Sequence, residues 1–132
     1  MRTVTIAIAL FFLLVAPAFA QSDPSPEAPS IAPSELSERR ASGSAPVVID
    51  VRTPEEYAAG HIPGALNISF DQVAQRISEV EAPHGVALYC MVGPRARKGE
   101  AALLSAGYTP VLHLEGGLAA WQAAGLPVER EH

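Results

Sequence analysis

The chemistry most open to this chain is that of a thiolate, because its single cysteine, Cys90, precedes a short loop and a cluster of basic residues. The sequence Met-Val-Gly-Pro follows the cysteine and leads to Arg95, with Arg97 and Lys98 close behind. Backbone N–H groups of such a loop and nearby positive charge favour the thiolate and hold an anionic group bonded to its sulfur. The plainer alternative is a buried core cysteine. The loop and its basic residues favour a functional thiol.

Two charged residues and the histidines are the other candidates for a site. Asp50 and Arg52 follow an apolar run, so we expect an ion pair that supports the Cys90 loop, with direct substrate contact as the alternative. His61, in the sequence Gly-His-Ile-Pro-Gly, is expected to fix a turn through ring hydrogen bonds. The other histidines lack ligand spacing, and one cysteine excludes an internal disulfide or a zinc site with several thiolates. We therefore predict no metal site.

The elements that must position these residues alternate between strands and helices. Apolar, β-branched runs predict strands at 47–51, 65–68, 86–90 and 111–114. Caps and periodic apolar residues predict helices at 54–59, 70–80, 96–106 and 118–124. The alternation predicts an α/β fold with a mainly parallel central sheet of about four to five strands and helices on both faces. Cys90 then ends a strand, at the edge where open α/β sheets bind ligands.

Residues 1–20 have the pattern of a secretory signal peptide. Arg2 precedes the apolar run 4–15, and small residues occupy the −3 and −1 positions of a cleavage site after Ala20. An uncleaved membrane anchor needs about 20 apolar residues, whereas Pro17 interrupts this run. We therefore expect export to the periplasm and no membrane span in the mature chain.

The segment after the predicted signal peptide has the composition of a linker. Residues 21–34 are rich in proline and serine and predict a disordered or extended spacer, within which Ile31 could still pair as an edge strand. The folded domain is expected over residues 35–132. A net charge of −5 argues against a nucleic-acid partner, because such partners are held mainly through their phosphates.

Three segments together resemble the motifs of the rhodanese family. Residues 47–57 (VVIDVRTPEEY) and 60–65 (GHIPGA) look like its N-terminal signature, and residues 89–95 (YCMVGPR) look like its active loop. Residues 114–118 (LEGGL) with Trp121 look like its closing motif. The resemblance implies the rhodanese α/β fold and a single-domain thiosulfate sulfurtransferase that needs no metal or organic cofactor.

By the same resemblance, Cys90 is the nucleophile that carries a sulfane sulfur as a persulfide. The donor is thiosulfate or a polysulfide or persulfide, and the acceptor is cyanide or a thiol. Met91, Val92, Gly93 and Arg95 are implied to bind the substrate through their loop, although the intervening proline lacks an N–H. The implied partners are a small sulfur-containing anion or thiol, with a protein thiol as a further candidate acceptor.

Two other functions stay open at this point. A sulfur carrier or docking module without turnover needs the same thiolate. A phosphatase or arsenate reductase uses a similar anion-holding loop, but its Cys-x5-Arg pattern places arginine six positions after the cysteine. Position 96 is alanine here and Arg95 comes one residue early, so the shorter loop suits one sulfur atom better than a tetrahedral oxyanion.

Overall fold

A five-stranded sheet forms the centre of the part of the chain that the computed structural model describes, residues 9, 11–15 and 26–131. Its strands all run parallel, in the order β1-β5-β4-β2-β3. They are β1 (Ser30–Ile31), β2 (Val47–Asp50), β3 (Leu66–Asn67), β4 (Val86–Tyr89) and β5 (Val111–Leu114). The predicted α/β fold with a parallel sheet is therefore confirmed.

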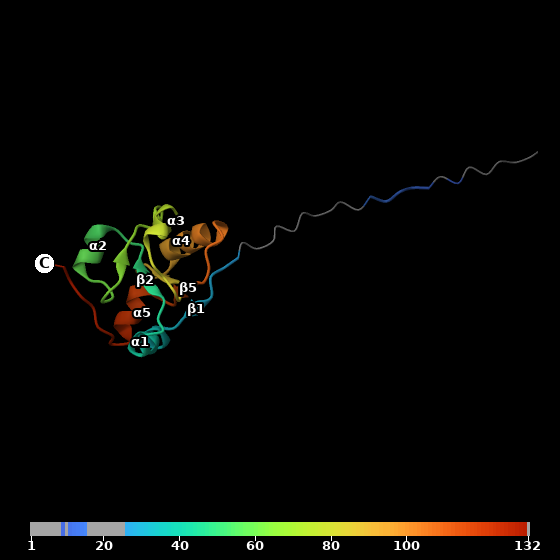
Figure 1. Ribbon diagram of the computed structural model, residues 1–132. Coiled ribbons are helices and arrows are strands. Elements are labelled where there is room, and N and C mark those ends of the chain that lie inside the picture. Colours follow the sequence, from blue (N-terminus) through green and yellow to red (C-terminus); the bar gives the residue numbers. More distant parts are fainter. Residues whose placement is uncertain (1–8, 10, 16–25, 132) are drawn as a thin grey trace, which may run out of the picture.

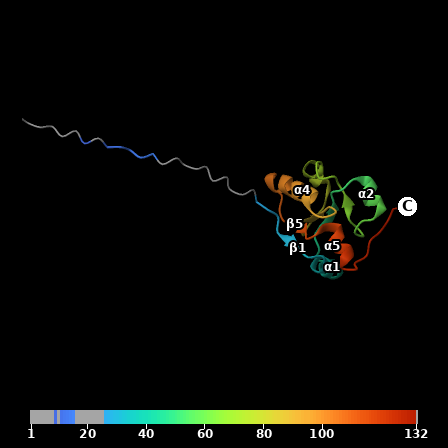
Figure 2. The ribbon, with the colours of Figure 1, turned by 180° about the vertical axis from the view of Figure 1, so that it is seen from behind.

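Helices cover both faces of this sheet (Figure 1). Along the described chain they are α1 (Pro33–Ser42), α2 (Pro54–Ala59), α3 (Val73–Arg76), α4 (Pro94–Ser105) and α5 (Gly117–Ala123). Helices α3 and α4 lie on one side of the sheet and α1 and α5 on the other, and the view from behind agrees (Figure 2). Each side buries its own apolar cluster, so the sheet is covered on both faces as parallel sheets require.

Strand β4 is the central strand and carries Cys90 at its carboxyl end. All four of its residues are buried, and it pairs with β2 on one side and β5 on the other. Tyr89 lies opposite Asp50 of β2, which brings the ends of these two strands together. The cysteine is therefore positioned by a fully buried strand at the centre of the sheet.

The folded domain begins earlier than the sequence predicts. Ser30 and Ile31 pair with β5, and α1 begins at Pro33 and was not predicted. Ile31 is 2% exposed and Leu36 is fully buried, so both contribute to the core beside α5. The boundary at 34/35 is therefore too late, because apolar burial outweighs the proline-rich composition of this stretch. Ile31 does form the edge strand considered for it.

The rest of the predicted N-terminal organisation lies largely outside the described residues. Positions 21–25 of the spacer and all of the signal peptide except residues 9 and 11–15 fall there. Those few residues have no regular secondary structure. In the described part of the chain, no helix has the length and apolar character needed to cross a membrane.

The helix predicted over 70–80 is shorter in the structure. It is divided into α3 and a 3-10 turn, Ile77–Glu79. Just before the predicted start, the hydroxyl of Ser69 donates a hydrogen bond to the carboxylate of Asp71 at 2.6 Å. The helix begins only at Val73, and Gln72 before it makes no capping hydrogen bond through its side chain.

Candidate active site

The sulfur of Cys90 lies in a buried loop between β4 and α4. The residue is 1% exposed, and its Sγ accepts a hydrogen bond from the backbone N–H of Gly93 at 3.0 Å. Gly93 is also the residue that precedes α4, which begins at Pro94. Among the described residues, Gly93 is the one whose backbone N–H donates a hydrogen bond to Sγ. The sequence suggested several such N–H donors from the same loop.

The carbonyl groups of the loop are tied to α5, away from the sulfur. The N–H of Leu118 donates to the carbonyl of Cys90 at 2.9 Å, and the N–H of Ala119 donates to that of Met91 at 3.1 Å. Gly117 makes this approach possible, because a Cβ at that position would lie 2.5 Å from the carbonyl oxygen of Cys90. These two bonds fix the carbonyl groups of Cys90 and Met91, and with them the backbone of the loop.

Arg95 is oriented by a carboxylate from another helix. Its guanidinium makes two bonds to Glu56, at 2.7 and 2.9 Å, and Glu56 also completes a capping box with Thr53 at the start of α2. The hydrogen bond from Arg95 lowers the pKa of Glu56 to about 2, and burial opposes this shift. The same bonds raise the pKa of Arg95, and the nearby Cys90 contributes to that rise. Arg95 therefore places a fixed positive charge near the sulfur.

Asp50 and Arg52 form the expected ion pair at the carboxyl end of β2. Both are buried, and Nη2 of Arg52 lies 2.7 Å from Oδ2 of Asp50 and 2.6 Å from the carbonyl oxygen of Gly60. The guanidinium also lies over the ring of Tyr89, 5.9 Å from its centroid. Burial raises the pKa of Tyr89, and the negative charge of Asp50 raises it further, so the hydroxyl stays neutral. This hydroxyl accepts a hydrogen bond from the N–H of Ile62. The pair thus packs beside the residue that precedes Cys90.

His61 fixes the turn after α2, as the sequence suggested. Its Nδ1 lies 2.7 Å from the carbonyl oxygen of Tyr57, and the two rings stack with their centroids 3.7 Å apart. These contacts give His61 a local structural role beside α2.

The outer surface of the Cys90 loop is apolar. Val92 is 62% exposed and Met91 is 38% exposed, although both are large hydrophobic residues. The sulfur itself lies beneath this surface. The loop that holds the buried sulfur therefore presents two apolar side chains to solvent.

Sequence reasoning missed two pairs of polar side chains near this loop. Nothing in the local sequence links Glu56 to Arg95, which lies 39 positions away. The second pair joins Glu100 of α4 to His113 of β5, with Nδ1 2.6 Å from Oε2. A glutamate and a histidine on the buried faces of their elements are the signal that could have revealed it.

The described residues contain no group of three histidine, cysteine, aspartate or glutamate side chains placed to hold a metal ion.

Comparison with known proteins points to one family. The rhodanese-like domain family matches residues 32–124. A sulfurtransferase of Allochromatium vinosum is 40% identical over 93 residues, which are 70% of this chain and 87% of that protein. A thiosulfate sulfurtransferase GlpE of Pseudoalteromonas translucida is 33% identical over 78 residues, which are 59% of this chain and 74% of that protein.

The similarity extends to solved structures. The solution structure of the rhodanese-like domain of the Anabaena Alr3790 protein has a TM-score of 0.70 at 33% identity, covering 77% of this chain and 79% of that chain. In three further relatives, the chain spans only 44%, 59% and 54% of the relative's length.

Proposed function

The chain belongs to the rhodanese family, and from this premise we propose that it is a sulfurtransferase in which Cys90 carries the sulfur as a persulfide. The proposed donor is thiosulfate or another sulfane-sulfur compound, and the acceptor is cyanide or a thiol. The observation that carries the proposal is the hydrogen bond from the N–H of Gly93 to the Cys90 sulfur at the carboxyl end of the central strand.

The proposed reaction proceeds in two half-reactions. The Cys90 thiolate attacks the outer sulfur of thiosulfate, the sulfur–sulfur bond of the donor breaks, and sulfite leaves with the bonding electron pair. The resulting persulfide then gives its outer sulfur to cyanide, which forms thiocyanate and restores the thiolate. No external oxidant or reductant enters either step.

The site supplies what both half-reactions need. Negative charge stays on sulfur throughout, and the amide of Gly93 together with the positive charge of Arg95 stabilises an anion there. Because Arg95 is held by Glu56, its charge is already in place before a donor arrives. The substrates that fit this arrangement are small anions or thiols that present one exposed sulfur atom.

Intact-mass measurement tests the persulfide directly. Incubation with thiosulfate is expected to add about 32 Da to the protein, and cyanide is expected to remove it. Cys90→Ser is the matched control, which should fold normally and gain nothing. A wild-type protein whose mass is unchanged by thiosulfate and by polysulfide, with a reduced Cys90, would refute the proposal.

Steady-state turnover separates an enzyme from a sulfur carrier. An enzyme releases thiocyanate repeatedly from thiosulfate and cyanide, with the parallel-line kinetics of a two-step transfer. A carrier accepts one sulfur and delivers it only to a protein partner. Thiocyanate formed at no more than one equivalent per protein would therefore favour carriage over turnover.

The contacts of Arg95 count against phosphatase or arsenate reductase chemistry. Such enzymes direct an arginine at the oxyanion, whereas both terminal nitrogens of Arg95 bind Glu56. Hydrolysis of a phosphate ester or reduction of arsenate by wild-type protein but not by Cys90→Ser would restore that alternative.

Export is a further part of the proposal, supported by the sequence pattern of residues 1–20. The mass of the protein recovered from the periplasm of its host tests it. A mature chain that begins at Gln21 is expected, and a full-length chain retained in the cytoplasm would refute export.

A further inference from the structure

Two large apolar side chains are exposed directly after the nucleophile in the chain. They are Met91 and Val92, and Val92 is the more exposed of the two. Adjacent apolar side chains on a surface are typical of interaction sites, and methionine adapts to partners of different shape. The apolar surface next to Cys90 therefore suits a partner with apolar groups of its own.

Three exposed carboxylates share the edge of the sheet that carries Cys90. We call Glu55, Asp71 and Glu115 the acidic rim. They come after the carboxyl ends of β2, β3 and β5, respectively. Because all the strands run parallel, these ends lie at the same edge as the end of β4.

Glu115 leaves the sheet on the strand next to Cys90. Strand β5 pairs with β4 so that His113 lies opposite Leu88, and both chains continue from there to their carboxyl ends. Neighbouring strands lie about 4.8 Å apart. Three residues after Glu115, the N–H of Leu118 donates to the carbonyl of Cys90 at 2.9 Å, so the chain that follows Glu115 contacts the loop itself.

The other two members of the acidic rim belong to segments that are joined to the same region. Glu55 lies in the first turn of α2, and the ion pair of Arg95 with Glu56 connects that turn to the start of α4 at 2.7 Å. The residue before Asp71 donates its N–H to the carbonyl of Val51 at 3.1 Å, at the end of β2. Carboxylates therefore occupy three segments that meet at the loop.

Positive charges near this edge do not offset the acidic rim. Lys98 of α4 is exposed, and its ammonium lies 5.7 Å from the centroid of the Phe70 ring. The three carboxylates and this one ammonium leave a net charge of −2. The arginines of this region are each held by a carboxylate: Arg52 by Asp50, Arg95 by Glu56, and Arg97 by Glu27 and Glu100.

An apolar centre with an acidic rim matches a polypeptide that has both apolar and basic side chains. Protein interfaces combine an apolar core with a polar rim, and complementary charges bring the right partners together. A second copy of this chain fits poorly, because a symmetric contact would place one acidic rim against the other. An anionic lipid surface is repelled for the same reason.

We propose that Met91, Val92 and the acidic rim form a docking surface for a partner protein that presents a cysteine thiol flanked by apolar and basic side chains. The inference rests on the proposed sulfur transfer through Cys90 and names the class of its acceptor. The partner's thiolate attacks the outer sulfur of the Cys90 persulfide. Cys90 leaves as a thiolate with the bonding electron pair, and the partner carries the persulfide, so no oxidant or reductant is needed.

Three peptides serve as probes, each with its one cysteine activated as a mixed disulfide with 2-thiopyridine. Their sequences are Lys-Leu-Cys-Leu-Lys, Glu-Leu-Cys-Leu-Glu and Lys-Ser-Cys-Ser-Lys. The Cys90 thiolate attacks the peptide sulfur, and 2-thiopyridone leaves as the chromophore that is recorded. Each rate is divided by the rate of the same peptide with 2-mercaptoethanol, which corrects for differences in the intrinsic reactivity of the disulfides.

The charge of the peptide tests the acidic rim. At low salt we expect the lysine–leucine peptide to react at least about tenfold faster than the glutamate–leucine peptide. At 1 M salt, where the Debye length is about 3 Å, this preference should largely disappear. The double variant Glu55→Gln/Glu115→Gln should lose most of the preference even at low salt.

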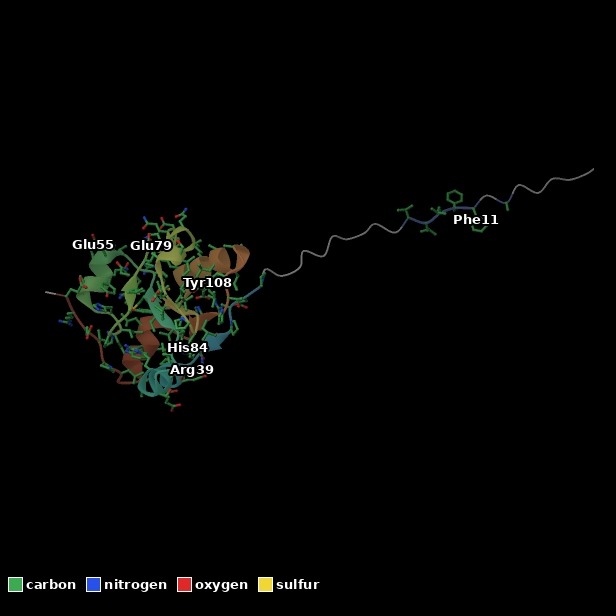
Figure 3. All side chains as sticks on the ribbon, viewed as in Figure 1. Phe11, Arg39, Glu55, Glu79, His84 and Tyr108 are labelled. Atoms are coloured by element: carbon green, nitrogen blue, oxygen red, sulfur yellow. The ribbon has the colours of Figure 1, made fainter. Side chains whose placement is uncertain are left out.

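Glu35→Gln/Glu38→Gln is the matched control, because it changes the net charge by the same amount. Both residues are exposed on α1, and Arg39, which follows Glu38, lies well apart from Glu55 on the folded domain (Figure 3). This variant should keep the wild-type preference. Equal rates for the lysine and glutamate peptides in wild type, or a preference that the control variant loses as fully as Glu55→Gln/Glu115→Gln, would overturn the proposal.

Val92→Thr tests the apolar centre, since it keeps the shape of the side chain and replaces a methyl group by a hydroxyl. The exposure of Val92 makes the change compatible with folding. We expect a rate roughly three- to fivefold lower with the lysine–leucine peptide, the effect of one apolar group removed from a contact, and a wild-type rate with the serine peptide. The same loss with both peptides would overturn the apolar part of the proposal.

Sedimentation of the wild-type protein tests the alternative occupant. A dimer whose Cys90 reacts with none of the three peptides would assign the surface to a second copy and overturn the proposal, whereas a reactive monomer is expected. None of these readouts needs a sulfur donor. Failure of thiosulfate to load Cys90 would therefore refute the proposed function while leaving this comparison of peptides intact.

Discussion

Gly117→Ala tests whether the approach of α5 to the Cys90 loop sets the geometry of the sulfur. The new Cβ would lie 2.5 Å from the carbonyl oxygen of Cys90 and 2.7 Å from that of Met91, where ordinary contact begins at about 3.4 Å. Both are backbone atoms and cannot rotate away. The loop must therefore retreat by about 0.9 Å, or the start of α5 must move by the same distance.

The expected cost comes from backbone strain and two hydrogen bonds. Gly117 has φ near +60°, where an alanine is strained by about 1 kcal/mol. Retreat of the loop also breaks the bonds from Leu118 and Ala119 to the loop carbonyls, at about 1 kcal/mol each. The free energy of unfolding should fall by about 3 kcal/mol. A shift near 1 Å at the nucleophile should lower the rate of sulfur transfer by up to about 100-fold.

Gly125→Ala is the matched control for this prediction. Its φ is +73°, so alanine has similar strain there, but nothing lies within 4 Å of the added Cβ. Its expected cost is about 1 kcal/mol, with an unchanged rate. Urea unfolding followed by circular dichroism gives the stabilities, and sulfite release from thiosulfate gives the rates. Equal losses of stability and activity in the two variants would refute the reasoning, because strain alone would then explain Gly117→Ala.

Three further predictions concern the charged groups around the site. Arg95→Ala should raise the KM for thiosulfate by about tenfold but leave the KM for a neutral organic trisulfide nearly unchanged. Glu56→Gln is its control, because that variant keeps Arg95. Equal losses for both donors would mean that Arg95 only supports the loop. Because the folded-state pKa of Glu56 is depressed to about 2 from 4.5, its contribution to stability is complete above pH 4.5 and is lost as the pH falls toward 2. About a third of each side chain is exposed, so solvent screening reduces the contribution of Glu56 to the free energy of unfolding to about 1 kcal/mol. Urea unfolding across this pH range should show this pH-dependent contribution in the wild type and not in Glu56→Gln. Asp50→Ala leaves the buried Arg52 without its carboxylate and should lower the unfolding free energy by about 3–5 kcal/mol, whereas a loss below about 1 kcal/mol would show that the carbonyl of Gly60 suffices.

Features that depend on neighbouring residues could be predicted from the sequence. The apolar run before Cys90 specifies a buried strand, and Thr53, Pro54 and Glu56 specify the start of α2, because a capping box needs only residues three apart. The start of α4 was predicted two residues late. Pro94 was read as part of the loop, although proline suits the first position of a helix.

Features that depend on packing were harder to predict. The proline-rich composition near residue 30 indicated a spacer, whereas the exposed edge of β5 offers Ser30 and Ile31 a partner. Burial of Ile31 and Leu36 against α5 then offsets the entropy of ordering this stretch. Composition indicates whether a segment is ordered by itself, but it does not show which surface of the folded domain the segment can pack against.

The sequence by itself determined the alternation of strands and helices, the place of Cys90 after an apolar strand, and the glycines that permit a tight loop. These follow from local backbone preferences and short-range hydrogen bonds. Tertiary structure alone decided that Arg95 meets Glu56, that His113 meets Glu100, and that the amides of α5 hold the loop carbonyls. These contacts join residues from separate elements. Their geometry exists only once the parallel sheet has set the order and register of its strands.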